Sequence, residues 1–355
     1  MPSNRPGDRQ TVAIVVPNYN HAAYLPHSLA SIAAQTRAPD QVLIIDDAST
    51  DNSLDVIGEF ISRHPSWKLI KHGERLGVFA GQNEALNSLQ TDWISFLGAD
   101  DMLHPTYLEK GMRGAAEPGT PDLICGCIKI IGDVGRSNLR PILLPSLQPR
   151  YIPPDEVRRL LEIGDNYFAG VVMLYRRQAV LDSGGFDKTL ESLSDGVLMR
   201  QLAIRSGFYF VPEILGYWRL IGTNYSTTRV TRPEQIEPLL ARMRQAISSE
   251  RHGTFPARYD EILDQRIRFG GVRLLATNRQ LSAAERADRI AALLHLAPWQ
   301  RAILQTLLSM GYLGSICALA WLTLRTPPMS LTRFLGQWRA RRAIIAAEQR
   351  GRGPG

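Results

Sequence analysis

The sequence predicts an α/β fold, in which a mostly parallel sheet is flanked by helices and followed by a C-terminal helical module. Three observations support this class. Short, β-branched apolar runs alternate with helix-period segments over the first hundred residues, as in parallel sheets with right-handed crossovers. Acidic pairs directly follow two of those runs, and beyond residue 230 the periodicity is helical.

The predicted elements alternate regularly at first. Buried strands are expected where short apolar runs end at turn residues, at 11–16, 41–45, 67–70 and 93–97. Helices with one apolar face are expected between them, at 24–35, 49–60 and 77–89. The later, less regular chain predicts strands at 122–131, 169–175 and 208–211 and helices at 176–182, 195–206, 234–249, 257–277 and 282–295.

We expect three parts, at 1–228, 229–300 and 301–355, and the charge distribution separates the last of them from the rest. The net charge of +7 belongs to the last part, which contains eight arginines and one acid, Glu348, whereas charges in the first 300 residues cancel. A basic tail on a neutral body suits an anionic membrane surface better than a nucleic acid, so no nucleic-acid partner is expected. A solubilising tail is the alternative.

Residues 302–324 contain no charged side chain and are long enough to cross a bilayer. Polar residues dilute the stretch, which leaves three alternatives: a membrane-embedded or interfacial hairpin or helix, a single span, or a buried helix. The polar N-terminus lacks a signal peptide, and three sparse cysteines indicate a reducing compartment. We expect a cytoplasmic protein whose tail, 301–355, can make peripheral contact with the inner face of the cytoplasmic membrane.

Two acidic pairs, Asp46-Asp47 and Asp100-Asp101, each follow a predicted buried strand. The carboxyl ends of parallel strands meet at one edge of the sheet, where ligands bind. Four carboxylates on one edge repel each other unless a cation neutralises them. A divalent metal, Mn or Mg, that also carries a phosphate ligand is therefore predicted. Helix caps and turns are the alternative for either pair alone.

Four segments in order carry a family resemblance. They are P-x-Y-N through D-D-x-S-T-D in residues 11–53, L-G-V with an asparagine in 76–83, FLGADD in 96–101, and G-G-F-D followed by Ser-Asp in 184–195. Their order and spacing resemble family 2 glycosyltransferases, nucleotide-sugar enzymes of the Rossmann-like type A (GT-A) fold. The resemblance covers about residues 10–228, so 1–228 is expected to be the catalytic domain.

The resemblance also implies residue roles. Asp47 matches the position that accepts a hydrogen bond from the nucleotide base. Asp100 matches the last aspartate of the metal-binding D-x-D motif, and the adjoining Asp101 is expected to share its metal-binding role. Asp195 matches the catalytic general base, which takes the proton of an acceptor hydroxyl as its oxygen attacks the anomeric carbon with inversion. The expected donor-binding set is Pro17, Tyr19, Asp47, Gly77, Asn83 and Asp100.

The leading interpretation is an inverting glycosyltransferase that moves a sugar from a nucleotide-diphosphate donor to a glycan or glycolipid acceptor, in polysaccharide or glycolipid biosynthesis. Two departures from the family pattern stand out. Gly98 occupies the first position of the D-x-D motif, and Ile221 stands where a histidine is common. Arg219 or Arg229 could supply positive charge instead.

These departures motivate an alternative, a non-catalytic paralogue that binds nucleotide-sugar or an assembly partner. A nucleotidyltransferase is a third interpretation. The segment after the first strand, 17–20, argues against it, because it lacks the glycines and lysine of a phosphate loop.

Overall fold

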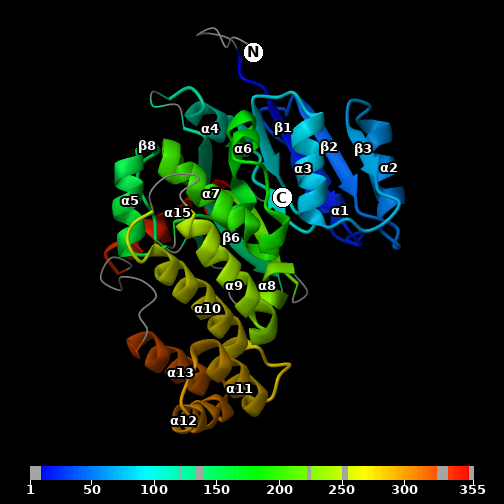
Figure 1. Ribbon diagram of the computed structural model, residues 1–355. Helices are drawn as coiled ribbons and strands as arrows, with labels where there is room; N and C mark the ends of the chain where they lie inside the picture. The colour runs from blue at the N-terminus through cyan, green and yellow to red at the C-terminus, as the bar shows by residue number, and fades with distance from the viewer. Residues whose placement is uncertain are drawn as a thin grey trace.

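The computed structural model describes residues 9–117, 119, 121–132, 139–141, 143–165, 167–221, 225–249, 255–325 and 335–351. One ten-stranded sheet, with helices packed against it, forms the upper part of the molecule in Figure 1. A group of helices forms the opposite end, and two longer helices connect the two parts. The predicted α/β class with a C-terminal helical region is confirmed.

The first half of the sheet is parallel and has the strand order β3-β2-β1-β4. These strands are β1 (Val12–Asn18), β2 (Gln41–Asp46), β3 (Lys68–Lys71) and β4 (Trp93–Phe96). Three helices connect them: α1 (Leu25–Ala33), α2 (Ser53–Arg63) and α3 (Val78–Ser88). All seven predicted elements are present. The central strands β1, β2 and β4 are short runs buried on both faces, which leave few alternatives to a strand. The two acidic pairs follow β2 and β4, the neighbours of β1.

The second half of the sheet is mixed. Its strands are β5 (Met102–Leu103), β6 (Leu123–Gly132), β7 (Leu139–Arg140), β8 (Arg150–Ile152), β9 (Leu174–Arg176) and β10 (Phe208–Leu220). The antiparallel β9 lies between β4 and β6. Helices of this half are α4 (Tyr107–Gly114), α5 (Pro154–Ile163), α6 (Arg177–Asp182) and α7 (Ser194–Ser206).

Two strand predictions in this half need correction. The predicted strand at 169–175 begins instead as a 3-10 turn, Gly170–Val172, and only its end pairs as β9. The strand predicted at 208–211 continues to Leu220. Pro212 and Gly216 make the sequence look interrupted there, but two irregularities in the pairing with β6 absorb them.

The helical region comprises α8 (Tyr225–Val230), α9 (Pro233–Ser248), α10 (Tyr259–Thr277), α11 (Ala283–Leu294), α12 (Pro298–Ser309), α13 (Gly311–Arg325) and α15 (Trp338–Gly351). Buried residues of α9 and α10, such as Leu240 and Val272, belong to the same hydrophobic core as one face of the sheet. The helices are therefore continuous with the α/β core, and α11 to α13 lie at its far end (Figure 1).

The uncharged stretch 302–324 forms two helices instead of one. α12 ends at Ser309 and α13 begins at Gly311, whose φ of +72° favours glycine. Among the described residues, no helix is both long enough and apolar enough to cross a membrane. The single-span alternative is therefore wrong for this part of the chain, because the helix is interrupted between Ser309 and Gly311.

The last described helix, α15, packs on the sheet. Glu348 accepts hydrogen bonds from Lys129 Nζ on β6 (3.1 Å) and Tyr217 Oη on β10 (3.2 Å). Arg341 donates to the carbonyl oxygens of Leu139 and Pro141, both at 2.7 Å. Part of the predicted basic tail is thus anchored on the α/β core.

Candidate functional site

The turn after β2 is fixed by its own carboxylates. Asp46 is fully buried and accepts hydrogen bonds from Asn18 Nδ2 (2.8 Å) and from the main-chain N–H of Ser49 (3.0 Å). Asp51 accepts from the N–H groups of Ala22 and Ser53. The D-D-x-S-T-D segment therefore holds the loops after β1 and β2 together. Asp46 needs no metal to offset its charge, which weakens the argument from four repelling carboxylates.

Asp47 organises the loop that leads into α3. Its carboxylate accepts from the N–H of Leu76 (2.8 Å) and of Gly77 (2.9 Å), and it meets His72 Nδ1 at 2.8 Å. Burial would raise the pKa of Asp47, but these hydrogen bonds lower it below its ordinary value. Gly77 has a φ of +91° at the start of α3, which explains a glycine there. Asp47 is thus an ionised, immobilised acceptor at the sheet edge.

His72 is a site residue that the sequence analysis missed. It is buried between two carboxylates, with Nδ1 at 2.8 Å from Asp47 and Nε2 at 2.9 Å from Glu84. Burial would lower the pKa of His72, but hydrogen bonds with Asp47 and Glu84 raise it. The signal was present in the register: Asp46 pairs with Lys71 in parallel strands, so the next residues, Asp47 and His72, come side by side.

Pro17 and Tyr19 lie at the carboxyl end of β1, beside the Asp47 turn. The guanidinium of Arg75 lies 4.0 Å from the centroid of the Tyr19 ring, so a cation–π contact ties the ring to the loop before α3. Pro17, Tyr19, Asp47 and Gly77 thus border one edge of the sheet. Four of the predicted donor-binding residues are brought together there.

Asn83 has a different environment. Its Nδ2 donates to the carbonyl oxygen of Phe186 (2.9 Å), and its Oδ1 accepts from the N–H of Phe186 (2.8 Å). Gly185, with φ +78°, packs so closely that a Cβ there would lie 2.6 Å from Asn83 Oδ1. Asn83 therefore fastens α3 to the G-G-F turn, which links two of the motif segments.

Gly98, Asp100 and Asp101 form a compact turn after β4. A Cβ on Gly98 would lie 2.9 Å from Asp100 Oδ1 and 3.0 Å from Asp101 Oδ2. The two carboxylates occupy the space that a side chain at 98 would need, which explains the departure from D-x-D. Burial and the neighbouring charge of Asp100 raise the pKa of Asp101 well above its ordinary value.

Arg219, near the end of β10, is the cation at this turn. Its main-chain N–H donates to Asp101 Oδ1 (2.9 Å) and its Nε donates to the carbonyl oxygen of Asp100 (3.1 Å). Ile221 follows on the same chain segment and is half-buried. Arg229 is instead paired with Glu191 at 2.8 Å. Of the two arginines considered for this role, Arg219 is the one at the acidic turn.

The turn fits a divalent cation that takes few ligands from the protein. The described residues contain no group of three or more acidic, histidine or cysteine side chains arranged to hold a metal ion. Carboxylate oxygens from Asp100 and Asp101 are nevertheless the donors that Mn²⁺ or Mg²⁺ prefers. A phosphate-bearing ligand and water would have to complete the coordination.

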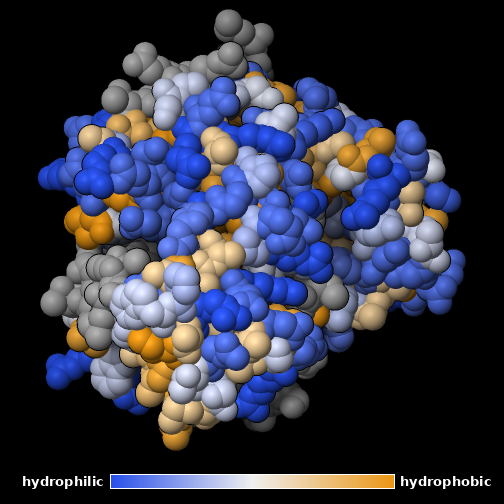
Figure 2. Space-filling model, turned by 60° about the horizontal axis from the view of Figure 1, so that its bottom comes forward, coloured by the Kyte–Doolittle hydropathy of each residue, from blue (hydrophilic) through white to orange (hydrophobic). Residues whose placement is uncertain are grey.

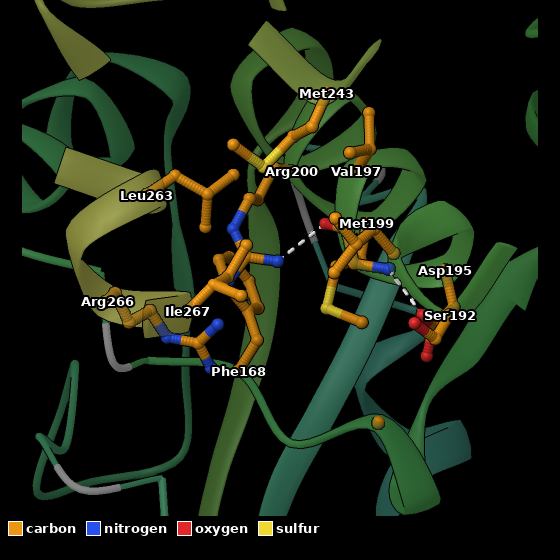
Figure 3. Close-up of a pocket in the computed structure, with 13 residues that line it drawn as sticks. Phe168, Ser192, Asp195, Val197, Met199, Arg200, Met243, Leu263, Arg266 and Ile267 are labelled. Atoms are coloured by element: carbon orange, nitrogen blue, oxygen red, sulfur yellow. Dashed lines mark hydrogen bonds between the residues drawn. The ribbon is translucent and has the colours of Figure 1, made fainter. Parts of the chain in front are cut away.

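Asp195 lies in the first turn of α7 and lines a cavity of about 170 Å³ (Figure 3). Burial raises the pKa of Asp195, while the N–H of Gly196 (2.7 Å) and the charge of Arg200 oppose the rise. A carboxylate with a raised pKa is a better proton acceptor near neutral pH. The walls of the cavity come from α7, from the chain around Phe168, and from α9 and α10 of the helical region.

Arg200 positions the beginning of α7. Its Nε and Nη2 donate to Asp165, at 2.7 and 2.9 Å, and its Nη1 donates to the carbonyl oxygen of Gly196. Asp165 is fully buried, so the pair is a buried, bidentate ion pair. Figure 3 shows Arg200 between Met243 and Met199, next to the turn that carries Asp195. Asp195 is thereby held in place from the interior side.

Residues 13–184 match the family described as Glycosyl transferase family 2. Among curated relatives, a glycosyltransferase of PGL/p-HBAD biosynthesis from Mycobacterium bovis is 35% identical over 92 residues. That alignment covers 26% of this chain and 36% of the relative, so the chain spans about a third of its length.

Two solved structures have similar folds over most of the chain. TarS residues 1–349 of Staphylococcus aureus, in complex with UDP-GlcNAc, gives a TM-score of 0.56 at 15% identity and covers 89% of this chain and 91% of that one. The mannosyltransferase PcManGT of Pyrobaculum calidifontis, with GDP-Man and Mn²⁺, gives 0.55 at 19% identity and covers 97% and 87%. At these identities the likeness concerns the fold, which is the GT-A fold.

Proposed function

We propose that the chain is an inverting glycosyltransferase with a nucleotide-diphosphate sugar donor. Residues 13–184 belong to glycosyl transferase family 2, whose members are enzymes that transfer glycosyl groups. The observation that carries the proposal is Asp195, a carboxylate of raised pKa on the wall of a cavity. A general base at that place can take the proton of an acceptor hydroxyl without contacting the nucleobase of the donor.

The donor nucleotide binds at the edge formed by β1, β2 and the loop before α3. Asp47 accepts the ring N–H of the base with a lone pair left beside its two main-chain donors. Pro17 and Tyr19 form the wall on the β1 side, and Gly77 allows the main chain to approach closely. Asn83 contributes indirectly, by fixing α3 to the G-G-F turn.

The diphosphate binds at the turn after β4. Asp100, with Asp101 beside it, would hold the divalent cation, and the cation when bound offsets the charge of the departing diphosphate. Arg219 adds a fixed positive charge at the same turn. Support for a metal also comes from PcManGT, whose structure contains Mn²⁺.

Asp195 acts on the acceptor. Its carboxylate takes the proton of the acceptor hydroxyl while the hydroxyl oxygen forms a bond to the anomeric carbon. The bond from that carbon to the diphosphate oxygen breaks on the opposite side, and its electron pair leaves with the nucleoside diphosphate. A single displacement of this kind inverts the anomeric configuration, and no sugar–enzyme bond forms.

The acceptor is a glycan or glycolipid, so the enzyme works in the synthesis of a polysaccharide or glycolipid. Support comes from the M. bovis relative, whose name assigns it to PGL/p-HBAD biosynthesis. The cavity of about 170 Å³ beside Asp195 has room for one sugar-sized group.

The end of the helical region makes peripheral contact with a membrane. Large apolar side chains are exposed on and beside α12 and α13, namely Trp299, Ile303, Met310, Tyr312, Leu313 and Ile316. Figure 2 shows hydrophobic residues gathered at the lower end of the molecule. No acidic residue occurs between Asp288 and Glu348, whereas seven arginines do, so the charge of this region suits an anionic surface.

Co-sedimentation with phosphatidylglycerol vesicles tests this contact, with phosphatidylcholine vesicles for comparison. Replacing Trp299 and Leu313 by serine should reduce binding to the anionic vesicles at least several-fold. Leu147→Ser, which alters an exposed apolar residue elsewhere, is the control. Equal binding of all three proteins would contradict a membrane role for α12 and α13.

Calorimetric titration with UDP, GDP, ADP and CDP, with and without Mn²⁺, tests the donor half of the proposal. We expect one nucleotide to bind far more tightly with Mn²⁺ than without it, and Asp100→Ala to abolish that difference. A nucleotide affinity that is the same with and without Mn²⁺ would contradict the role of Asp100. A folded protein that binds none of the nucleotides would contradict the donor class.

A further inference from the structure

Three arginine side chains, one of which lines the Asp195 cavity, have no partner among the residues that the structure describes. Arg266 and Arg273 are on α10 and Arg140 is on β7. None of their guanidinium groups makes a hydrogen bond or an ion pair with any residue that the structure describes, although other arginines of the region, such as Arg200 and Arg268, are bound by carboxylates. Each is half-buried, where an uncompensated charge is costly.

Arg266 connects this group to the cavity. It lines the same space as Asp195, and its Nε is buried without a hydrogen-bond partner. Figure 3 shows its guanidinium reaching from α10 toward Phe168. Burial lowers the pKa of Arg266, Asp165 and Asp195 oppose this, and Arg200 adds to it.

Arg140 and Arg273 extend the positive charge away from the cavity. Arg273 is seven residues after Arg266, so both lie on one face of α10. Arg341 of α15 donates to the carbonyl oxygens on either side of Arg140, which brings a fourth guanidinium to the same place. Burial and the charges of Arg273, Arg266 and Arg341 lower the pKa of Arg140 to about 9.

The acidic groups nearby do not balance these charges. Asp165 is engaged in both hydrogen bonds from Arg200, and Glu348 is engaged by Lys129 and Tyr217. The charge of Asp195 acts on both Arg200 and Arg266, and Asp195 must accept a proton during the proposed reaction. No carboxylate of the described residues forms an ion pair with Arg140, Arg266 or Arg273, so their charges suit an anionic ligand.

We propose that Arg140, Arg266 and Arg273 bind a phosphate or diphosphate ester of the acceptor, so that the cavity beside Asp195 is the acceptor site. Each guanidinium group can donate to two oxygens of a phosphate at once. A cluster of several arginines therefore suits a ligand with two or more negative charges better than it suits a single carboxylate. The inference rests on the proposed function, because it takes Asp195 as the base that faces the acceptor.

Titration of the full chain with inorganic pyrophosphate in EDTA tests the site, since no metal is then present for the Asp100 turn. We expect saturable binding that weakens as salt rises and that falls at least ten-fold in Arg140→Gln and in Arg266→Gln. The control is Arg279→Gln, an exposed arginine just after α10. Absence of binding, or equal binding in all four proteins, would overturn the proposal.

Thermal unfolding shows whether the variants are folded. Since the arginines repel one another, we expect Arg140→Gln to unfold no earlier than the wild-type protein without ligand. Pyrophosphate should raise the wild-type Tm but leave that of Arg140→Gln nearly unchanged. A pyrophosphate-induced shift of equal size in both would overturn the proposal even if calorimetry were ambiguous.

Nucleotide titration separates this inference from the proposed function. Pyrophosphate binding should persist when the tightest nucleoside diphosphate and Mn²⁺ saturate the donor site; its displacement would mean that the arginines serve the donor. Intact nucleotide binding with no pyrophosphate site would reject the inference but keep the donor assignment.

Competition against pyrophosphate identifies the source of the phosphate. Stronger competition by a prenyl phosphate in detergent micelles indicates a lipid-linked acceptor. Stronger competition by a soluble sugar 1-phosphate indicates a phosphorylated glycan. Failure of both to compete would overturn the assignment to the acceptor.

Discussion

His72 joins Asp47, at the proposed nucleotide-binding edge, to the exposed carboxylate of Glu84. Its two ring nitrogens meet Asp47 and Glu84, so both hydrogen bonds need the doubly protonated ring. The raised pKa of His72 means that this arrangement is complete below the ordinary histidine pKa and is lost as the pH rises through the folded value. Because the pKa of Asp47 is lowered, its carboxylate is protonated, and its hydrogen bond with His72 is lost, only at acid pH.

We therefore expect nucleotide affinity to fall as the pH rises through the pKa of folded His72. His72→Gln should bind the nucleotide roughly ten-fold more weakly at pH 6, in line with about 1–3 kcal/mol for a lost charged hydrogen bond, and its affinity should depend less on pH. Calorimetry from pH 6 to 9 measures both effects. His27→Gln, on the exposed side of α1, is the control, and a pH profile unchanged in His72→Gln would contradict the assignment.

At Gly98, we expect the family's usual aspartate to weaken metal-dependent nucleotide binding. Gly98→Asp restores the D-x-D letters, but its Cβ would press on the carboxylates of Asp100 and Asp101. We expect Mn²⁺-dependent nucleotide binding to weaken by roughly ten-fold, because overpacking costs about 1–3 kcal/mol. Gly58→Asp, where nothing lies within 4 Å, is the matched control for calorimetry. Tighter metal binding in Gly98→Asp would show that the glycine is a defect.

The residue-level site was only partly predictable. Asp47 directly follows β2, Asp100 lies in the turn after β4, and Asp195 lies in the first turn of α7, so the motifs located all three at the ends of elements. His72 escaped notice because no motif letter marks it, although the register of β2 and β3 places it beside Asp47. Arg266 could not be found from the sequence, since its place in the cavity beside Asp195 depends on how α10 packs over the α7 turn.

At the scale of elements, Asn83 decides how α3 is joined to the second half of the domain. Asn83→Ala removes both hydrogen bonds to Phe186, so we expect a loss of about 1–3 kcal/mol in the free energy of unfolding. Nucleotide affinity should change far less than in Asp100→Ala. Urea unfolding and calorimetry measure the two effects, and Asn87→Ala on the same helix is the control. Lost nucleotide binding at unchanged stability would instead make Asn83 a donor ligand.

Strands that are buried on both faces were predictable, because they appear in the sequence as short, continuous apolar runs. β1, β2 and β4 are such strands. The errors have local causes: the turn at Gly170–Val172 has strand-like composition, and β10 contains Pro212, which normally ends a strand. The break between α12 and α13 depends on one glycine, Gly311, within an apolar run. The gathering of Pro17, Tyr19, Asp47 and Gly77 at one edge of the sheet followed from the topology, whereas the cavity beside Asp195 did not.

At the scale of the whole molecule, α15 closes the chain back onto the sheet through a buried ion pair. Lys129 and Glu348 are each largely buried, so removing one leaves the other charge without its partner. We expect Lys129→Met or Glu348→Leu to cost about 3–5 kcal/mol of unfolding free energy, and the double variant to cost much less. Urea unfolding of the four proteins as a double-mutant cycle measures this. Additive single effects would show that α15 is not held by the pair.

The helical region therefore does more than extend the catalytic domain. α9 and α10 supply Met243, Leu263 and Arg266 to the cavity that contains Asp195, and α12 and α13 expose apolar side chains at the far end. The proposed acceptor site and the proposed membrane contact thus lie on one continuous body of helices (Figure 1). This arrangement suits an acceptor that is presented at a membrane surface.

The central claim is that Asp195 is the base of a glycosyl transfer, and the comparison of wild type with Asp195→Asn tests it most directly. Release of nucleoside diphosphate from a panel of nucleotide sugars with Mn²⁺ and a membrane-extract acceptor is measured, with calorimetry for nucleotide affinity. We expect turnover to fall by roughly 10²–10⁴-fold at unchanged affinity, and wild-type activity to decline below the raised pKa of Asp195.

Asp182→Asn, an exposed carboxylate on α6, should keep full activity. Because the carboxyl of Asp195 is buried and its pKa is raised, Asp195→Asn should unfold no earlier than the wild type. A folded Asp195→Asn protein that turns over donor at the wild-type rate would contradict the account.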